Sequence, residues 1–173
     1  MKKTILATAT AVILCAAAFA QEGSMNAQPR RQMQSEERPT AKGFIADIEN
    51  LTDGNSNFRR VLYTGKHLQL VLMTLKPGEQ IGEEVHADTD QFFRIEEGKG
   101  EVRINGEATK IKEGDAILVP AGARHNVINT SGEPLRLYTL YAPPQHRDGT
   151  VHTTKADAEG AKEHFDGKTT EPQ

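Results

Sequence analysis

A short segment of the sequence carries side chains that could bind a metal ion together. Residues 82–86 read Gly-Glu-Glu-Val-His, and alternate side chains of a strand share a face, so Glu84 and His86 should point the same way. A short turn leads to a second strand, on which Gln91 would lie beside His86. His125 opens a later strand and could close the set from across a barrel. Two oxygen donors with two imidazoles suit zinc, manganese, iron, nickel or cobalt.

The chemistry of this set depends on its arrangement, because each residue type alone is weak evidence. A carboxylate buried in a barrel must be paired or ligated, since an isolated one is very costly. With Glu84, His86, Gln91 and His125 as ligands, one divalent transition metal would keep open positions for substrate oxygens. Such an ion acts as a Lewis acid on a carbonyl or enediol oxygen, or lowers the pKa of bound water. Glu84 is also the candidate catalytic base, and the alternative is a hydrogen-bonded cluster that only binds a ligand.

The elements that must position these residues are short strands. Apolar and β-branched runs alternate with turn residues between about residues 41 and 144, without apolar periodicity of helix length. The expected strands are 44–48, 59–64, 68–75, 81–86, 91–96, 101–105, 107–111, 116–119, 125–129 and 135–141. Asn105 and Gly106 predict a type I′ hairpin turn, because both positions tolerate positive φ. The pattern predicts an all-β sandwich or barrel.

Two spaced motifs resemble those of the cupin family. The first family motif places Gly, His-x-His, Glu and Gly at fixed intervals, and this chain has Gly78, Glu84-Val85-His86, Gln91 and Gly98 there. Glu84 thus replaces the first His, and Gln91 replaces the Glu. The second motif is matched at every position, by Gly114, Pro120, Gly122, His125 and Asn129. The resemblance covers roughly residues 41–145. It implies one jelly-roll barrel (a double-stranded β-helix), a metal in its mouth and a homodimer.

The N-terminal residues predict export. Residues 1–20 begin with two lysines, continue with an alanine-rich apolar run and end in Ala-Phe-Ala, which is typical of a cleaved signal peptide. A membrane anchor and a lipoprotein signal at Cys15 are the alternatives, but Leu14 stands where lipid attachment needs a small residue. Cleavage would remove the only cysteine, which suits a periplasmic or secreted protein. Residues 21–40 are polar and predict a flexible linker.

The C-terminal residues 146–173 predict a polar tail. Thr154 and Asp157 could form the capping box of a short helix. His146 and His152 flank a short loop in this tail. His152 could fold over the barrel mouth, but histidines in a tail are usually solvated. Tyr138 and Tyr141 lie on opposite faces of the last expected strand, so at most one of them should reach the barrel cavity.

Composition narrows the classes of function. The chain has 173 residues with 21 Lys and Arg against 24 Asp and Glu, which gives no sign of nucleic-acid binding. A single Cys excludes a disulfide scaffold and a cysteine zinc cluster. We therefore expect a metal-dependent enzyme acting on a small sugar-like or enolisable oxygenated substrate, by isomerisation or ring opening. The alternatives are an Fe(II)-dependent dioxygenase and a non-catalytic binding protein, which a cavity without further acid or base residues would favour.

Overall fold

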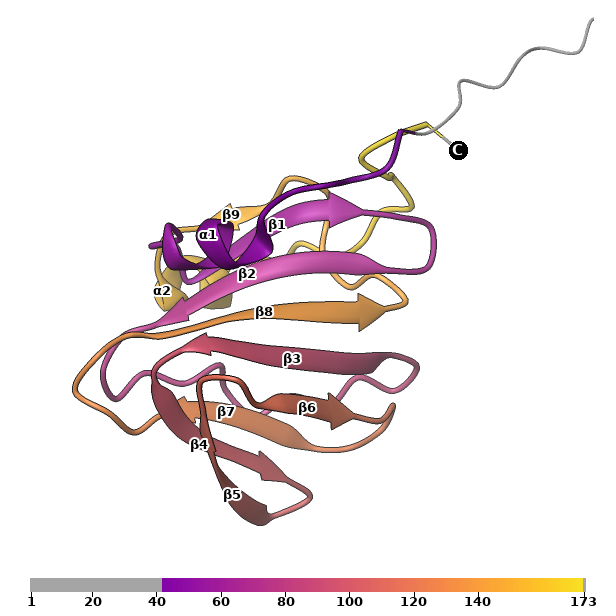
Figure 1. The fold of residues 1–173 in the computed structure, drawn as a ribbon. Coiled ribbons are helices and arrows are strands. Elements are labelled where there is room, and N and C mark those ends of the chain that lie inside the picture. Colours follow the sequence, from indigo (N-terminus) through magenta and orange to yellow (C-terminus); the bar gives the residue numbers. More distant parts are fainter. Residues whose placement is uncertain (1–41, 173) are drawn as a thin grey trace, which may run out of the picture. The chain divides into compact units, whose positions relative to one another are not determined.

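The computed structural model describes residues 42–172, which form two antiparallel sheets (Figure 1). In spatial order the larger sheet contains β6 (Ala116–Val119), β3 (Asp90–Glu97), β8 (Leu135–Ala142), β2 (Gln69–Leu75), β1 (Arg59–Thr64) and β9 (Val151–His152). The smaller sheet contains β5 (Glu107–Lys112), β4 (Lys99–Ile104) and β7 (His125–Asn129). The predicted signal peptide (1–20) and linker (21–40) lie outside the described residues.

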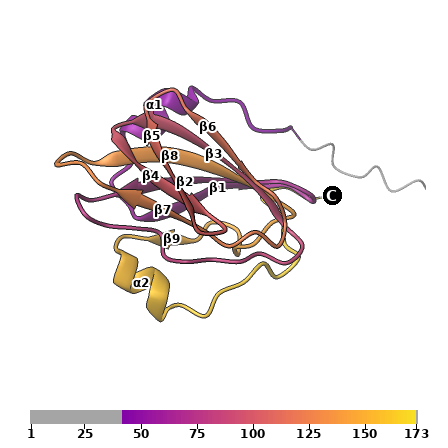
Figure 2. The same cartoon turned by 90° about the horizontal axis from the view of Figure 1, so that it is seen from below.

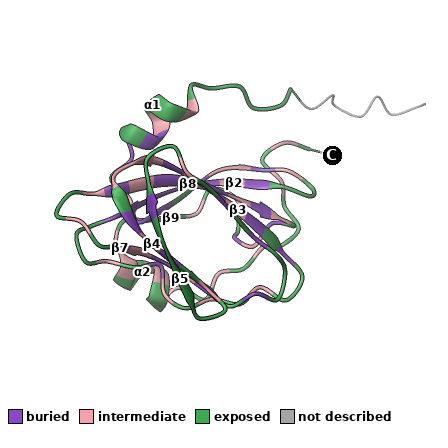
Figure 3. Ribbon diagram, turned by 60° about the horizontal axis from the view of Figure 1, so that its bottom comes forward, coloured by how far each residue is buried: buried purple, intermediate pink, exposed green. Residues whose placement is uncertain are grey.

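Alternating burial along the strands builds the core between the two sheets. Along β8 buried and half-buried residues alternate, and buried residues recur along β3 (Figure 3). The buried residues of β3 are Gln91, Phe93 and Ile95. The smaller sheet contributes Val102 and Val127 to the same cluster. Apolar inner faces pressed together in this way are the main stabilising contribution of such a domain. The structure confirms the predicted all-β jelly-roll barrel.

Two local features fix the smaller sheet. Asn105 has φ of 50° and Gly106 of 90°, which confirms the predicted tight turn between β4 and β5. Gly100 on β4 lies against the main chain of β7, where a Cβ atom would collide with the carbonyl oxygen of Ile128. A side chain there would force apart the two strands, and one of them begins with His125.

Two predicted strands are absent from the described residues. Residues 44–47 have no regular structure, and α1 (Ile48–Asp53) follows because the Asp47 carboxylate accepts a hydrogen bond from the Asn50 amide at 3.1 Å. The predicted strand 81–86 is reduced to one isolated pair, that of Glu84 with His125. Gly82 has φ of 112°, which breaks the extended conformation.

The residues predicted to form a polar tail pack against the barrel. His152 in β9 pairs with Arg59 in β1, so this segment extends the larger sheet. The predicted capping box is present: Thr154 and Asp157 bond reciprocally at the start of α2 (Lys155–Gly160), which lies outside the strands (Figure 2). Further on, the amide of Thr170 donates to the Thr64 carbonyl. No helix among residues 42–172 is long and apolar enough to cross a membrane.

Candidate metal centre

The structure brings together all four side chains singled out in the sequence. Glu84 and His86 come from the segment between β2 and β3, Gln91 from β3 and His125 from β7. Glu84 is fixed against His125 by two main-chain hydrogen bonds, of 2.9 and 3.0 Å. Gln91 and His125 are almost fully buried, whereas Glu84 and His86 are half-buried.

The separations between these side chains suit ligands of one ion. His86 Nε2 lies 3.4 Å from Glu84 Oε2, and His125 Nε2 lies 4.0 Å from the same oxygen. His125 Nε2 lies 2.9 Å from Gln91 Oε1. Atoms that share a metal at about 2.0–2.2 Å stand roughly 3–4 Å apart. The set therefore has the dimensions of a site that could hold a transition metal.

The contact between His125 and Gln91 tests whether a cation fits. His125 Nδ1 lies 3.1 Å from the carbonyl oxygen of Ala123, so Nδ1 carries the proton of the neutral ring and Nε2 presents a lone pair. Gln91 Nε2 donates to Thr139 Oγ1 at 3.1 Å, which turns its Oε1 toward that lone pair. Two acceptors 2.9 Å apart repel each other unless a proton or a cation lies between them.

Two further atoms favour the cation. Glu84 Oε2 and His86 Nε2 are both buried and have no hydrogen-bond partner among the described residues. A buried acceptor left without a partner loses its hydration without compensation, and an ion between these atoms would restore it. The donor set therefore fits a divalent transition metal.

The electrostatics keep the carboxylate of Glu84 ionised. Burial raises its pKa, but the nearby ring of His86 and the charge of Arg59 outweigh burial and hold the pKa below its usual value. Arg59 Nη2 lies 3.7 Å from Glu84 Oε1. Glu84 can therefore offer a charged ligand atom at neutral pH.

Aromatic rings complete the wall of the site. Tyr141 is buried and packs edge-on against His86, with ring centroids 5.7 Å apart. Burial raises its pKa, so the phenol stays protonated. Tyr138 packs instead against Phe92. The prediction that at most one of the two tyrosines reaches the cavity is confirmed.

Sequence reasoning placed two histidines wrongly. His146 and His152 were expected in a solvated tail, but they are only 9% and 8% exposed. The buried side chain of Gln69 holds His146 in place: Gln69 Oε1 accepts from the His146 amide at 2.9 Å, and Gln69 Nε2 donates to its carbonyl at 2.7 Å. A glutamine at the start of the largely apolar strand β2 was the one available signal.

His146 also forms a pair with an acid that the sequence did not indicate. Its Nδ1 lies 3.0 Å from Glu163 Oε1, while Glu163 Oε2 accepts from the amide of Arg147 at 3.0 Å. Burial and the Arg59 charge lower the pKa of His146 more than Glu163 raises it, so the ring is neutral at neutral pH. The Tyr141 ring lies 5.1 Å from that of His146. This geometry leaves His146 Nε2 as an acceptor without a partner in the described residues.

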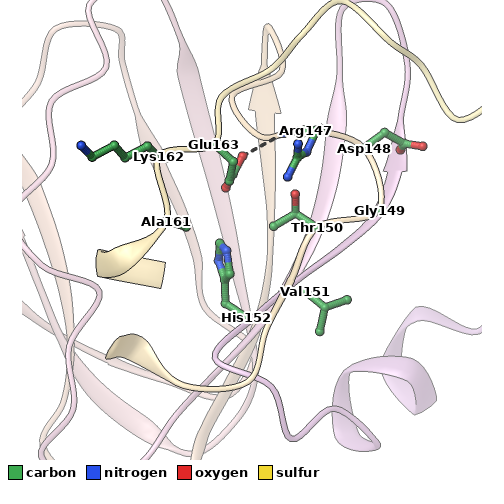
Figure 4. A pocket seen from close by; sticks show the side chains of 9 residues that line it. All are labelled: Arg147, Asp148, Gly149, Thr150, Val151, His152, Ala161, Lys162 and Glu163. Atoms are coloured by element: carbon green, nitrogen blue, oxygen red, sulfur yellow. Dashed lines mark hydrogen bonds between the residues drawn. The ribbon is translucent and has the colours of Figure 1, made fainter. Parts of the chain in front are cut away.

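A cavity of about 560 Å³ adjoins this region. Its lining consists of residues 147–152 and 161–163, and Figure 4 shows the side chains of Thr150, His152 and Glu163 turned toward a common space. His152 stands directly opposite Arg59 in the β1–β9 pairing. Arg59 does not line this cavity itself, but it neighbours both His152, which does, and Glu84.

Comparison with known proteins agrees with this architecture. Residues 71–141 match the family model described as "Cupin domain". The chain is 48% identical over 128 residues to the uncharacterized protein YrkC of Bacillus subtilis (strain 168), which covers 70% of this chain and 69% of that protein. It is 38% identical over 123 residues to the uncharacterized protein L612 of Acanthamoeba polyphaga mimivirus, which covers 68% of this chain and 76% of that protein.

A solved structure extends the similarity to the fold. The crystal structure of BH2720 from Bacillus halodurans is 48% identical, covers 73% of this chain and 98% of its own, and superposes with a TM-score of 0.67. The chain belongs to the cupin family. It is a cupin with a His/Glu site that could hold a metal ion.

Proposed function

We propose that this protein is a metal-dependent cupin enzyme that acts on a small, enolisable oxygenated substrate. One divalent transition metal would be held by Glu84, His86, Gln91 and His125. The observation that carries the proposal is the 2.9 Å approach of two acceptor atoms, His125 Nε2 and Gln91 Oε1, beside the partnerless Glu84 Oε2.

The protein's own groups define what the site can do. A bound divalent ion supplies a Lewis acid for a carbonyl or enediol oxygen. Thr139 orients the amide of Gln91, and the Ala123 carbonyl fixes the tautomer of His125. Phe93, fully buried beside the His125 ring, provides an apolar wall that excludes water.

The pair of His146 and Glu163 favours an enzyme over a binding protein. A cavity without acid or base groups beyond the metal ligands would have favoured simple ligand binding. Here the cavity is lined in part by Glu163, and this carboxylate holds the neutral imidazole of His146 beside the cavity, in the manner of a general base and its orienting partner. In an isomerisation or ring opening, His146 Nε2 would accept a proton from the carbon next to a carbonyl and return it elsewhere on the substrate.

A second candidate function is Fe(II)-dependent dioxygenation. Glu84, His86 and His125 offer ligand atoms within 4.8 Å of one another, and two histidines with one carboxylate are typical of non-haem iron oxygenases. Oxygen consumption by the Fe(II)-loaded protein with an enediol substrate would favour this candidate. Activity with zinc or manganese in the absence of oxygen would favour isomerisation or ring opening.

Metal analysis tests the site itself. The mature protein, purified without chelator or nickel resin, should contain about one transition metal per chain. The variant His125→Ala should lose it, whereas His67→Ala, at an exposed histidine, should keep it. Failure of the wild-type protein to take up metal after reconstitution at neutral pH would contradict the proposal.

A proton-exchange assay tests the catalytic part. Pyruvate in D₂O should exchange its methyl protons faster with the metal-loaded protein than with metal alone, as followed by proton NMR. His146→Gln should slow this exchange while metal content stays unchanged. A wild-type rate equal to that of free metal would argue against an enolising enzyme.

We also propose that the protein is exported, with cleavage after Ala20. The support is the composition of residues 1–20 alone. Mass spectrometry of the protein from its native cells should give a chain that begins at Gln21. A chain that begins at Met1 would refute export by this route.

A further inference from the structure

Arg59 is a buried cation without an adequate partner. The residue is 8% exposed, and its Nε is buried without a hydrogen-bond partner among residues 42–172. Its contact with a carboxylate is the 3.7 Å approach of Nη2 to Glu84 Oε1, which is longer than a hydrogen bond. Guanidinium carries five N–H donors and stays charged, so its burial is expensive unless a charge and acceptors compensate it.

Metal binding would remove much of the negative charge that Glu84 offers to Arg59. The inference rests on the proposed function at this point, because Glu84 is also a proposed metal ligand. A divalent ion bound to Glu84 would neutralise the charge of that carboxylate, and Arg59 would then face a site of net positive charge. Glu163 forms no ion pair with Arg59 among the described residues, and its two oxygens accept from His146 and from the Arg147 amide.

Other unpartnered groups lie on the same side of Arg59. His152 stands opposite Arg59 in the sheet, and its Nδ1 is buried without a partner in the described chain. The hydroxyl of Thr150 is likewise buried without a hydrogen-bond partner among the described residues. Thr150 and His152 line the cavity of about 560 Å³, which has room for a small organic molecule.

We propose that Arg59, with Thr150 and His152, binds the carboxylate of the substrate. The two-pronged guanidinium matches a carboxylate, and the ligand's negative charge would replace the one that the metal takes from Glu84. A hydroxyl or carbonyl oxygen next to that carboxylate would face the metal centre. The ligand class is therefore a small 2-hydroxy or 2-oxo acid, or a sugar acid, rather than a neutral sugar.

A pair of probes that differ in charge tests this proposal. Glycolate and glycolamide have nearly the same size and the same hydroxyl group, but glycolate alone is charged. Binding to the Mn(II)-loaded protein can be measured from the broadening of the ligand's proton NMR signals. Wild-type protein should bind glycolate at least tenfold more tightly than glycolamide, because hydrogen bonds to charged groups are the strong ones.

Two variants on one strand provide the comparison. Arg59→Gln should retain its metal and bind the two probes within about twofold of each other. Arg60→Gln, at the exposed neighbouring position, should keep the wild-type preference. If Arg59→Gln does not fold, Arg59→Lys serves instead, because lysine keeps the charge but lacks the two-pronged guanidinium. The preference for glycolate over glycolamide should then fall at least threefold.

The outcomes separate the two proposals. Metal-loaded wild type with no preference for glycolate, or a preference unchanged in Arg59→Gln or Arg59→Lys, overturns the carboxylate site and leaves the metal centre intact. A wild-type chain that binds no metal contradicts the proposed function, and with it the loss of Glu84's charge on which this inference depends.

Discussion

Replacing Gln91 by leucine should weaken the metal-loaded protein far more than the metal-free one. In the metal-free protein the change removes the repulsive contact with His125 Nε2. It also leaves the buried hydroxyl of Thr139 without its hydrogen-bond partner. An unsatisfied buried hydroxyl costs about 1–3 kcal/mol, and relief of the repulsion offsets part of it. The loss of metal-free stability should therefore stay near about 1 kcal/mol, because leucine is close to glutamine in volume.

In the metal-loaded protein the same change removes a ligand. Loss of an outer-shell partner alone weakens metal affinity by about 10–100-fold, so loss of the amide oxygen should cost at least that. At saturating metal this corresponds to about 1.4–2.7 kcal/mol of metal-dependent stabilisation, or about 5–10 °C in the unfolding temperature of a domain of this size.

Thermal unfolding with and without zinc or manganese measures both quantities. Gln80→Leu, at an exposed glutamine, is the matched control and should leave the metal-induced shift unchanged. Equal destabilisation of Gln91→Leu in the two forms would refute the reasoning, because it would mean that the amide oxygen does not contact the ion.

Three further predictions follow from the same structure. Burial lowers the pKa of His146 below 6.5, so the unfolded chain binds more protons and stability should fall as the pH drops below 6.5. His146→Gln should remove part of that fall in pH-dependent unfolding, whereas the exposed His164→Gln should not; identical profiles would show that His146 titrates normally. Gln69→Leu should lower the free energy of unfolding in urea by about 2–4 kcal/mol, since it leaves the amide and the carbonyl of His146 without their hydrogen-bond partner. A loss below about 1 kcal/mol would contradict this. The expected homodimer should depend on the outer face of the larger sheet, where Leu118 is 74% exposed. Leu118→Lys should sediment as a monomer where the wild type sediments as a dimer, and an unchanged dimer would exclude this face.

The sequence by itself was enough to find the four candidate ligands. Strand periodicity places Glu84 and His86 on one face, and that relation survives although the segment pairs only through the isolated bridge of Glu84 with His125. The turn at Asn105 and Gly106 was equally predictable, because its chemistry is local. Where local signals competed, as between the apolar residues at 44–48 and the cap at Asp47, the sequence alone did not show which would prevail.

Only the tertiary structure revealed the groups that surround the candidate ligands. Arg59 meets His152 because β1 pairs with β9, nearly a hundred residues later in the chain, and it also approaches Glu84, which belongs to neither strand. His146 becomes a buried, oriented imidazole because Gln69 and Glu163 hold it from two other segments. The composition of residues 146–173 predicts a solvated tail, and no local pattern overrides that. Burial there comes from long-range pairing, whose free energy depends on surfaces that do not exist until the barrel has formed.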